Sequence, residues 1–267
     1  MGAAGRIVAV VNQKGGVGKT TTAVNLAASF AVSERSTLLV DLDPQANATS
    51  AYGLVPQRHL YDALVGECVM KDVVLTTELA HLDVVPSGRD LYGAEVELVG
   101  REGREHQLTR MLAGVRDLYQ VVLIDCPPSL GLLSVNALCA ADAVLIPLQT
   151  EYYALEGLAA LLETIGLVRG GLNRELAIEG ILLTMYDARN RLCRQVADEA
   201  RRHFGTQVFR TTIPRNVRLS EAPSHGKPAI LYDAGSVGAR AYLQLAQELL
   251  DLWSSAPAGA QPEGGSR

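Results

Sequence analysis

The sequence has few aromatic residues, few cysteines and no excess of positive charge, and each shortage excludes a class of protein. Aromatic side chains make up 5% of the 267 residues, and the formal net charge is −5. A chain of this charge does not bind nucleic acid through its overall field, so any such role requires a local basic patch. The four cysteines lack C-x-x-C spacing, which argues against a zinc site and is typical of reduced, buried thiols in a cytoplasmic protein.

No apolar run approaches the length of a membrane span, and no signal-peptide pattern opens the chain. What the sequence does contain is 48% hydrophobic residues and 25 glycines, at a length that suits one α/β domain. Short apolar runs alternate with helical patterns, which predicts a doubly wound, mostly parallel sheet flanked by helices. We expect a single domain over residues 1–253 and a disordered, low-complexity tail over residues 254–267.

The glycine-rich segment Val11–Thr22, VNQKGGVGKTTT, joins a buried strand pattern to a helical one. Its glycines allow the backbone to fold into a cup with inward-pointing amides, and such a cup at a helix N-terminus binds phosphate. Lys19 would reach the β- and γ-phosphates, and the Thr20 hydroxyl would ligate Mg²⁺. A Gly-rich turn can also join a strand to a helix for geometric reasons alone, but the Lys-Thr pair favours the phosphate site. The residues expected to bind nucleotide here are Lys14, Gly15, Gly16, Val17, Gly18, Lys19, Thr20 and Thr21.

The loop departs from the common pattern G-x-x-x-x-G-K-[ST], because Gln13 replaces its first glycine and Lys14 is a second lysine. The segment K-G-G-V-G-K-T resembles the deviant Walker A loop of the ParA/MinD ATPases, with Lys14 in the place of the family's signature lysine. The resemblance implies that Lys14 crosses a dimer interface to the partner's nucleotide and acts like an arginine finger supplied in trans. ATP would then be a dimerisation switch.

Aspartates follow two predicted strands, at 37–40 and 120–125, where open α/β sheets bind ligands. Asp-Pro also commonly starts a turn, so the first aspartate motif has a second interpretation on its own. Beside a phosphate loop, D-L-D-P-Q-A-N resembles the family's second motif, which implies that Asp43 positions the attacking water and Asp41 supports the magnesium shell. V-L-I-D-C-P-P-S resembles the Walker B segment, in which Asp125 would hold a magnesium-bound water. The expected catalytic residues are thus Lys14, Lys19 and Asp43, and the expected metal-site residues are Thr20, Asp41 and Asp125, the aspartates through water.

Apolar periodicity and turn residues predict the remaining elements. In the family, the segment Pro214-Arg215-Asn216 lies against the adenine, so the resemblance implies nucleotide contacts for Pro214 and Asn216. The other predicted strands cover 82–86, 143–147, 178–184 and 208–213. The predicted helices cover 23–32, 59–65, 91–98, 155–168, a segment that ends at Phe204 with Gly205 as its C-cap, and 236–253.

Five motifs, KGGVGKTTT, DLDPQANATS, VLIDCPPSLG, LLTMYDAR and IPRNVRLSEAPSHGKP, together span residues 7–252 and resemble the Soj-type chromosomal ParA partition ATPases. The resemblance implies a homodimer that forms on binding ATP and Mg²⁺ and then binds double-stranded DNA without sequence preference. It also implies hydrolysis stimulated by a ParB-type partner, a role in chromosome or plasmid segregation, and a cytoplasmic, nucleoid-associated location. Because the first motif starts at once, we expect no separate DNA-reading domain before it.

Two related families share the deviant Walker A loop, and a third alternative is a protein that binds ATP but scarcely hydrolyses it. MinD-type proteins end in a basic amphipathic helix that lies on membranes, whereas residues 254–267 carry prolines, glycines and a single arginine, so no membrane partner is expected. Nitrogenase-reductase-like proteins hold an iron–sulfur cluster through cysteines of both subunits, and Cys126 has no second ligand motif beside it, so we interpret it as a packed residue. A nucleotide-dependent scaffold that scarcely hydrolyses ATP is the third alternative, against which Asp43 favours an ATPase.

A local excess of arginine contrasts with the acidic overall balance. Residues 189–218 contain eight arginines and two acidic residues, and Arg191, Arg194 and Arg201 lie on one helical face. A solvated helix with an Arg194–Asp198 pair is the alternative interpretation. The family resemblance favours a patch that contacts duplex phosphates, since few aromatic side chains lie near it for stacking on single strands. The residues expected to contact DNA are Arg189, Arg191, Arg194 and Arg218.

Overall fold

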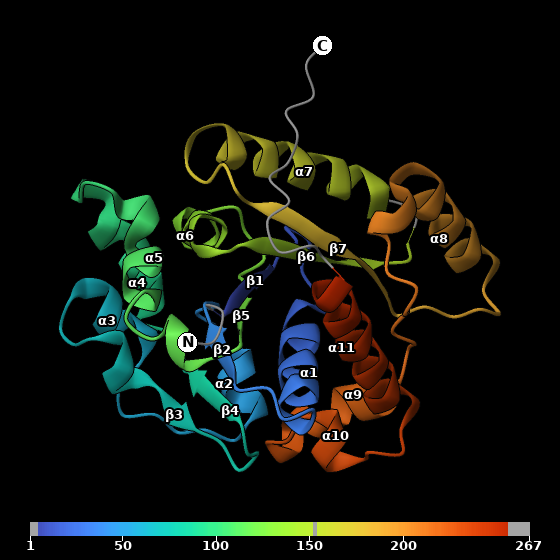
Figure 1. Cartoon of the computed structure of the whole chain (residues 1–267), viewed down its shortest axis with the longest axis horizontal. Helices are drawn as coiled ribbons and strands as arrows, with labels where there is room; N and C mark the ends of the chain where they lie inside the picture. Colours follow the sequence, from blue (N-terminus) through green and yellow to red (C-terminus); the bar gives the residue numbers. More distant parts are fainter. Residues whose placement is uncertain (1–4, 152–153, 256–267) are drawn as a thin grey trace.

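A seven-stranded sheet forms the centre of the fold, and helices cover both of its faces (Figure 1). The computed structural model describes residues 5–151 and 154–255. The strand order is β3-β4-β2-β5-β1-β6-β7, and every neighbouring pair is parallel except β3 and β4. This confirms the predicted doubly wound, mostly parallel sheet. The strands are β1 (Arg6–Val10), β2 (Thr37–Asp41), β3 (Leu75–Thr76), β4 (Leu82–Val85), β5 (Val121–Asp125), β6 (Ala143–Gln149) and β7 (Ala177–Thr184).

The helices connect these strands and differ widely in length. The α-helices are α1 (Lys19–Val32), α2 (Asn47–Ala51), α3 (Leu60–Val65), α4 (Leu91–Glu97), α5 (Gln107–Leu112), α6 (Leu132–Ala140), α7 (Ala154–Gly171), α8 (Arg191–Phe204), α9 (Val217–Glu221), α10 (Ala229–Tyr232) and α11 (Val237–Ser255). Short 3₁₀ turns are η1 (Met70–Val73), η2 (Leu98–Gly100), η3 (Arg104–His106), η4 (Arg116–Leu118), η5 (Gly205–Gln207) and η6 (Ala222–His225). No helix of the described residues is both long enough and apolar enough to cross a membrane.

The buried side chains form two layers, one on each face of the sheet. In β1, Ile7 and Ala9 belong to one layer while Val8 and Val10 belong to the other, at the period of two that a strand imposes. Helices α3 to α8 cover the first layer, and α1, α2 and α9 to α11 cover the second. Because both faces are covered, the central strands are apolar on both sides, as is typical of parallel sheets.

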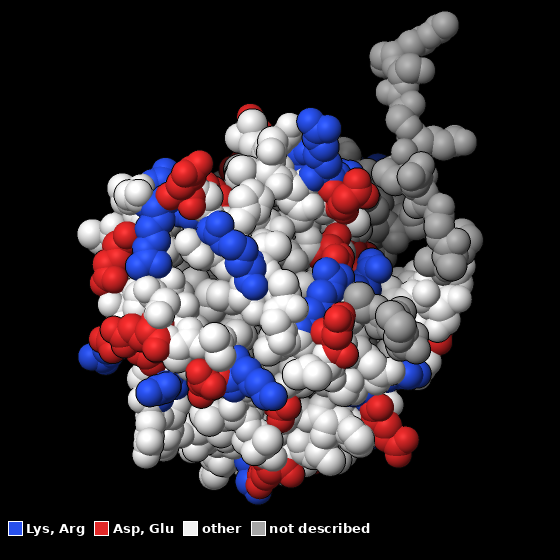
Figure 2. Space-filling model, turned by 60° about the vertical axis from the view of Figure 1, so that its left-hand side comes forward, with Lys and Arg blue, Asp and Glu red and all other residues white. Residues whose placement is uncertain are grey.

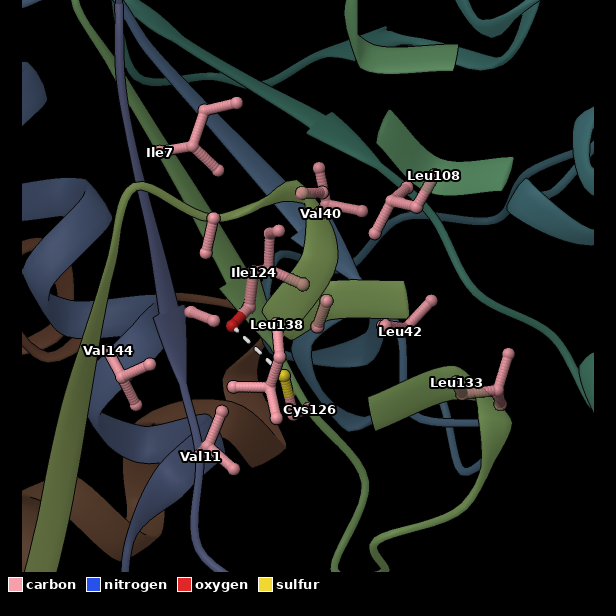
Figure 3. Packing of buried hydrophobic residues seen from close by; sticks show 14 of the residues in the cluster. Ile7, Val11, Val40, Leu42, Leu108, Ile124, Cys126, Leu133, Leu138 and Val144 are labelled. Carbon is pink, nitrogen blue, oxygen red and sulfur yellow. Dashed lines mark hydrogen bonds between the residues drawn. The ribbon is translucent and has the colours of Figure 1, made fainter. Parts of the chain in front are cut away.

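Cys126 lies fully buried in the first of these layers, among the side chains of β5, α6 and the end of β1 (Figure 3). Its thiol donates a weak hydrogen bond to the Ile124 carbonyl oxygen at 3.8 Å. Cys126 is therefore packed in the core of this chain. Cys139 and Cys193 are also buried, but Cys68 is only half-buried, so the expectation of four buried thiols is wrong for Cys68.

Residues 208–213 do not form the predicted strand. An isolated bridge joins Val208 to Ile181, and the N–H groups of Phe209 and Ile213 donate to the carbonyl oxygens of Ile181 and Leu183 on β7 at 3.0 Å and 2.9 Å. Between these two hydrogen bonds, the Glu248 carboxylate accepts the backbone N–H groups of Arg210 at 2.8 Å and Thr211 at 3.0 Å. The prediction is wrong because a carboxylate from α11 takes the amides that a continuous strand would need.

Six elements were not predicted from the sequence, namely β3, α2, α5, α6, α9 and α10, and the other differences lie at boundaries. Helix α1 begins at Lys19, four residues before the predicted helix, so the end of the glycine-rich loop is already its first turn. Helix α8 ends at Phe204 with Gly205 as its C-cap, as predicted. Helix α11 runs to Ser255, two residues past the expected end of the domain, and residues 256–267 of the expected tail lie outside the described residues. The division into a domain and a tail stays a prediction.

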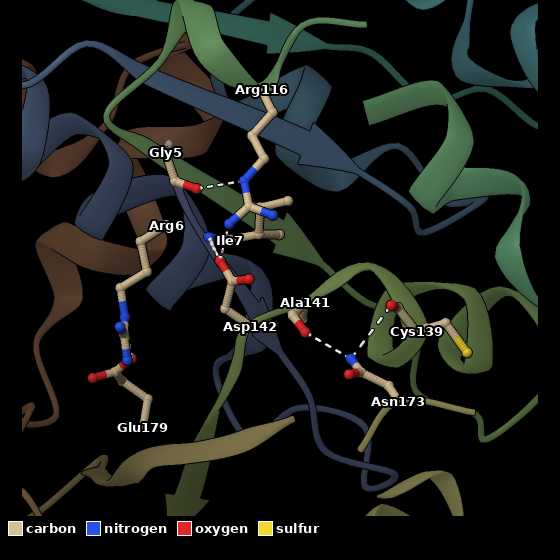
Figure 4. A network of polar contacts seen from close by, with 9 residues as sticks. All are labelled: Gly5, Arg6, Ile7, Arg116, Cys139, Ala141, Asp142, Asn173 and Glu179. Carbon is tan, nitrogen blue, oxygen red and sulfur yellow. Dashed lines mark hydrogen bonds and ion pairs between the residues drawn. The ribbon is translucent and has the colours of Figure 1, made fainter. Parts of the chain in front are cut away.

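A polar network ties the first strand to the last one (Figure 4) and, through Trp253, to the closing helix. The Glu179 side chain on β7 is 5% exposed, pairs with Arg6 at 2.8 Å and accepts the indole N–H of Trp253 at 2.8 Å. The Arg6 guanidinium also lies over the Trp253 ring, 5.4 Å from its centroid. Nearby, Asp142 accepts the backbone N–H of Ile7 at 2.8 Å. One carboxylate, Glu179, thus joins β1, β7 and α11.

We expect Glu179→Ala to lower the free energy of unfolding by about 2–3 kcal/mol, because two donors lose their shared buried acceptor. Urea denaturation followed by circular dichroism measures this loss. Glu102→Ala, at an exposed carboxylate without an ion pair in the described ranges, is the matched control and should change stability by less than about 0.5 kcal/mol. Equal stability of the two variants would show that the Glu179 network contributes nothing.

Candidate nucleotide-binding site

The loop between β1 and α1 forms an open cup at the N-terminus of a long helix. Gly16 and Gly18 have φ angles of +75° and +93°, in the left-handed region that glycine takes without strain. A Cβ atom added to Gly15 or Gly16 would meet nothing within 4 Å, so the space in front of the loop is open. The Gly18 carbonyl accepts the first helical hydrogen bond, from the Thr22 N–H at 2.9 Å. The free amides of the first turn and the helix dipole therefore face a space that suits phosphate.

Lys19, the first residue of α1, places a buried cation in this cup. The residue is 6% exposed, and its ammonium donates to the Lys14 carbonyl oxygen at 3.2 Å. Burial lowers the pKa of Lys19, while the carboxylates of Asp125 and Asp43 act in the opposite direction. Phosphate oxygens in the cup would replace lost solvation and favour the charged ammonium.

Asp125 lies at the end of the central strand β5 and is completely buried. Neither of its carboxylate oxygens has a hydrogen-bond partner among the described residues. Burial raises the pKa of Asp125 well above its usual range, and the neighbouring Asp41 raises it further, whereas the Thr20 hydroxyl and Lys19 lower it. A buried carboxylate without a partner, beside a hydroxyl and a phosphate cup, fits a Mg²⁺ ion that keeps its water shell.

Asp41 is paired with Asp125 across the β2–β5 register, at the same edge of the sheet. Its oxygens are already used inside the protein: one accepts the Thr49 N–H at 2.8 Å and the Thr49 hydroxyl at 2.7 Å, and the other accepts the Asp43 N–H at 3.2 Å. Burial raises the pKa of Asp41 to about 6, and these hydrogen bonds oppose the rise. In this structure Asp41 holds the turn that carries Asp43, and its expected place in the magnesium shell stays a prediction.

A cavity of about 270 Å³ lies in front of the cup, and Asp43 forms part of its wall. One Asp43 carboxylate oxygen accepts the Gln45 N–H at 2.9 Å, which fixes the side chain toward the phosphate side. Seven of the predicted site residues line this cavity, and Lys14, Val17, Asp41 and Asp125 do not. The cavity adds residues that the sequence did not single out. Its lining comprises Gly15, Gly16, Gly18, Lys19, Thr20, Thr21, Asp43, Gln45, Asn47, Pro128 and Met185.

A second cavity of about 400 Å³ continues from the first, since both are lined by Gly18, Thr21 and Met185. Pro214 and Asn216, the two residues expected to contact the adenine, both line it. The side-chain carbonyl oxygen of Asn216 is buried and has no hydrogen-bond partner within the described ranges. An acceptor in that state suits an exocyclic amino group such as that of adenine. The cavity is therefore large enough and chemically suited for a nucleoside.

Lys14 differs from Lys19 in that it lies at the surface. Its ammonium pairs with Glu151 at 2.9 Å, and the two side chains are 45% and 47% exposed. The Asn12 side chain accepts the Lys14 N–H at 3.0 Å and so fixes the backbone at the start of the cup. Glu151 could not be identified from the sequence, because it is 137 residues away and belongs to no motif.

The four arginines expected to contact DNA fall into two groups. Arg191 and Arg194 are exposed on α8 and form no ion pair within the described ranges. Asp198 likewise forms none there, so the alternative Arg194–Asp198 pair is absent from this part of the chain. Arg189 pairs with Asp187 at 3.2 Å, although its side chain is 92% exposed.

Arg218 is held more firmly than the other three arginines. It pairs with Glu221 at 2.8 Å and with Asp233 at 3.3 Å, and its guanidinium lies 5.9 Å from the centroid of the Tyr232 ring. An isolated bridge joins Tyr186 to Pro214, so the loop before Arg189 and the loop before Arg218 lie side by side. Both loops border the second cavity, which we call the nucleoside cavity.

Comparisons with known proteins agree with this geometry. A family model described as an AAA domain matches residues 5–178. Chromosome partitioning protein ParA of Myxococcus xanthus is 56% identical over 249 residues, which cover 92% of this chain and 88% of the relative. Sporulation initiation inhibitor protein Soj of Bacillus subtilis is 54% identical over 248 residues, which cover 92% and 98%. Chromosome-partitioning ATPase Soj of Treponema pallidum is 52% identical over 246 residues, which cover 92% and 97%.

Solved structures share the fold. A Mycobacterium smegmatis protein described as cobyrinic acid a,c-diamide synthase, with bound ADP and magnesium, has a TM-score of 0.83 and 37% identity, with 94% of this chain and 96% of that chain covered. The cell division ATPase MinD of Pyrococcus furiosus has a TM-score of 0.77 and 28% identity, with 93% and 99% covered. The first structure also exists with a bound ATP analogue and magnesium.

These findings confirm the predictions of the deviant P-loop fold, of ATPase activity, and of ATP and Mg²⁺ as cofactors. The relatives match nearly the whole described chain at more than half identity, and Lys19, Thr20 and Asp43 of two sequence motifs line one cavity. The chain belongs to the ParA/Soj family of chromosome-partitioning ATPases.

Proposed function

We propose that this protein dimerises on binding Mg-ATP, binds duplex DNA without sequence preference, and drives chromosome or plasmid segregation with a ParB-type partner. The observation that carries the proposal is the contrast between two lysines of one loop. Lys19 is buried inside the phosphate cup, whereas Lys14 is exposed at its rim. The buried lysine serves the nucleotide of its own subunit, and the exposed one can serve the nucleotide of another.

Each residue around the cup has its own role in hydrolysis. Lys19 and the amides of the first turn of α1 bind the β- and γ-phosphates, and Thr20 and Asp125 would hold Mg²⁺, the latter through water. When bound, Mg²⁺ neutralises charge that develops on the phosphate oxygens. Asp43, fixed by its hydrogen bond from Gln45, orients the attacking water on the γ-phosphate side.

The exposed Lys14–Glu151 pair supports the proposed dimerisation. An ion pair with both side chains nearly half exposed is weak, so its exchange for a triphosphate costs little. Two subunits facing each other through their cups would each supply Lys14 to the other site. Molecular mass measured by light scattering with ATP, with ADP and without nucleotide tests this step. A mass of one chain under all three conditions would contradict the proposal.

DNA binding is supported by the position of the basic residues beside the nucleoside cavity. Arg191 and Arg194 are available for phosphate contact, while Arg189 and Arg218 would exchange their internal carboxylates for DNA phosphates. One such patch on a monomer binds weakly, and a dimer joins two of them, which raises the affinity through effective concentration. The nucleotide state would therefore control DNA binding.

We expect replacement of Arg189, Arg191, Arg194 and Arg218 by Ala to weaken ATP-dependent DNA binding by roughly 100-fold on unrelated sequences alike, and to flatten its salt dependence. Fluorescence anisotropy with two unrelated duplexes over a salt series measures both effects. ATPase activity without DNA should persist. The matched control replaces four exposed cations elsewhere, Arg58, Lys71, Arg169 and Arg174. If the control weakens binding as much as the patch variant, overall charge and not this patch binds the DNA.

Two alternatives predict different results in simple assays. A MinD-like protein would sediment with anionic lipid vesicles in an ATP-dependent manner, whereas we expect no such binding. A scaffold with little hydrolysis would retain its ATP in a single-turnover assay, which the position of Asp43 argues against. We propose a cytoplasmic, nucleoid-associated location, which fluorescence microscopy of a tagged chain tests directly.

A further inference from the structure

A further cavity, of about 450 Å³, lies between the turn η1 and the end of α5. It is distinct from the nucleotide site, because it shares no lining residue with the phosphate cavity or the nucleoside cavity. Helices α3 and α5 lie at the left of Figure 1, and Figure 2 turns that side of the molecule forward, where uncharged areas lie between separate charged side chains. The volume is within the range of small-molecule sites, about 300–1,000 Å³. We call this space the η1–α5 cavity.

The walls of the η1–α5 cavity are mainly apolar and rich in sulfur. Met70 and Val115 are 3% and 2% exposed, and Cys68 and Met111 are half-buried. Methionine side chains are flexible and polarizable, so they adapt to the shape of an apolar group. Such walls suit the alkyl or aryl body of a ligand.

The charged residues in the lining are two cations, Lys71 and Arg110. Both residues are exposed, so they lie at the open side of the cavity. The Arg110 guanidinium donates to the Gly103 carbonyl oxygen at 2.7 Å, which restrains it there. Neither cation forms an ion pair with any residue that the structure describes. Two such cations beside an apolar space suit one anionic head group.

Carboxylates of the same stretch of chain do not line the cavity. The Asp62 carboxylate accepts the His59 N–H at 2.7 Å, and the Asp72 carboxylate accepts the Val69 N–H at 3.3 Å. Glu67 is exposed and also lies outside the lining. The charges of this region are therefore mixed, but those that line the cavity are both positive.

A small molecule fits this shape better than the face of a protein does. Among the described residues of the lining, Val69 is the one large apolar side chain that is mostly exposed, at 64%. The remaining apolar surface is recessed within the cavity, where a flat protein face would not reach it. A stable protein interface also needs about 800 Å² from each partner.

We infer that the η1–α5 cavity binds a small amphipathic anion, with an alkyl or aryl body and one carboxylate, sulfonate or phosphate head. The body lies against Met70, Met111 and Val115, and the head lies between Lys71 and Arg110. The inference does not depend on the proposed function, because it uses no residue assigned to ATP or DNA.

The first experiment uses 8-anilino-1-naphthalenesulfonate (ANS), an aryl body with one sulfonate that fluoresces in apolar surroundings. Mg-ADP is kept in excess so that the nucleotide site is occupied. We expect the wild-type chain to bind ANS saturably, and Lys71→Ala/Arg110→Ala to weaken this binding by roughly tenfold, because the head group loses both cations. The matched control, Arg169→Ala/Arg174→Ala, removes two exposed cations elsewhere and should bind ANS within about twofold of the wild type.

The second experiment locates the bound ANS without any substitution. Because Cys68 lines the cavity, ANS should shield its thiol from N-ethylmaleimide, and peptide mass spectrometry follows the modification. At about ten times the Kd of ANS, the labelling of Cys68 should slow by roughly tenfold. The urea-unfolded chain is the control, and ANS should not change its labelling. An unchanged rate in the folded chain would place ANS elsewhere and overturn the inference, even if the double variant failed to fold.

The third experiment identifies the head group by competition with ANS. Decanoate, decyl phosphate and decanol share an alkyl body and differ in the head. We expect displacement of ANS by decanoate, by decyl phosphate or by both, which separates a carboxylate from a phosphate ligand, and at least about tenfold weaker displacement by decanol.

Three results would overturn the inference. Equal displacement by decanol refutes the anionic head group, and a wild-type chain without saturable ANS binding refutes the site. Light scattering without nucleotide detects the remaining alternative. If decanoate converts a nucleotide-free dimer into monomers, a second copy of the chain and not a small anion occupies the cavity.

Discussion

Lys19→Ala should abolish nucleotide binding, with a loss of ATP affinity of roughly 1,000-fold. Lys19 is the buried cation of the phosphate cup, and two carboxylates, Asp43 and Asp125, act on it. Without the ammonium, these carboxylates would face the phosphates with less compensation, so the variant loses an attraction and gains a repulsion. Isothermal titration calorimetry with ATP and Mg²⁺ measures the effect.

The matched control for this experiment is Lys71→Ala, at an exposed lysine far from the cup. It should bind ATP like the wild type. Retained affinity in Lys19→Ala within a few-fold of the control would refute the assignment of this loop as the phosphate site. The thermal stability of the unliganded variant should not fall, because burial of the ammonium already disfavours its charged form.

Asp43→Ala should keep ATP binding and lose hydrolysis by about 100-fold or more, because a group that orients water acts on the chemical step and little on ground-state binding. The ATP-bound dimer should then accumulate. Single-turnover hydrolysis and light scattering on the same sample measure both effects. Turnover at the wild-type rate would show that Asp43 is only a turn residue.

Lys14→Ala is the informative counterpart of that variant. It should bind nucleotide but stay a monomer, since the Lys14 side chain points to the surface at the rim of the cup and its ammonium pairs only with Glu151 in the described part of the chain. Dimerisation of Lys14→Ala with ATP would contradict a role for this lysine across the interface. The two variants together separate assembly from chemistry.

Local sequence patterns were sufficient to predict most of the fold, because strand ends and glycine-rich turns are encoded within a few residues. Long-range contacts account for what was wrong or missing. The Glu248 carboxylate replaced the predicted strand at 208–213, and nothing within that segment signals an acceptor from α11. The exposure of apolar residues on α4 could not be predicted either, since an apolar sequence pattern does not show which face of a helix packs against the sheet.

In the site, too, local patterns predicted the residues, and long-range contacts could not be predicted. Sequence placed Lys19, Asp43 and Asp125 at the correct edge of the sheet, because parallel strands end there. It did not reveal that Thr49 donates two hydrogen bonds to one oxygen of Asp41, or that Glu151 pairs with Lys14, since each contact depends on the folded chain. Residue types define the candidates, and tertiary hydrogen bonds decide which of them are free to act.

The partial burial of a single cysteine makes this protein convenient for spectroscopy. Cys126, Cys139 and Cys193 are shielded, so a maleimide dye added to the folded wild-type chain should label Cys68. Burial raises the pKa of the Cys68 thiol, and labelling should therefore proceed best at mildly alkaline pH, where more of the thiolate forms. Cys68 follows α3, which packs against α4. A fluorophore there would report events at α4 in real time without an engineered cysteine.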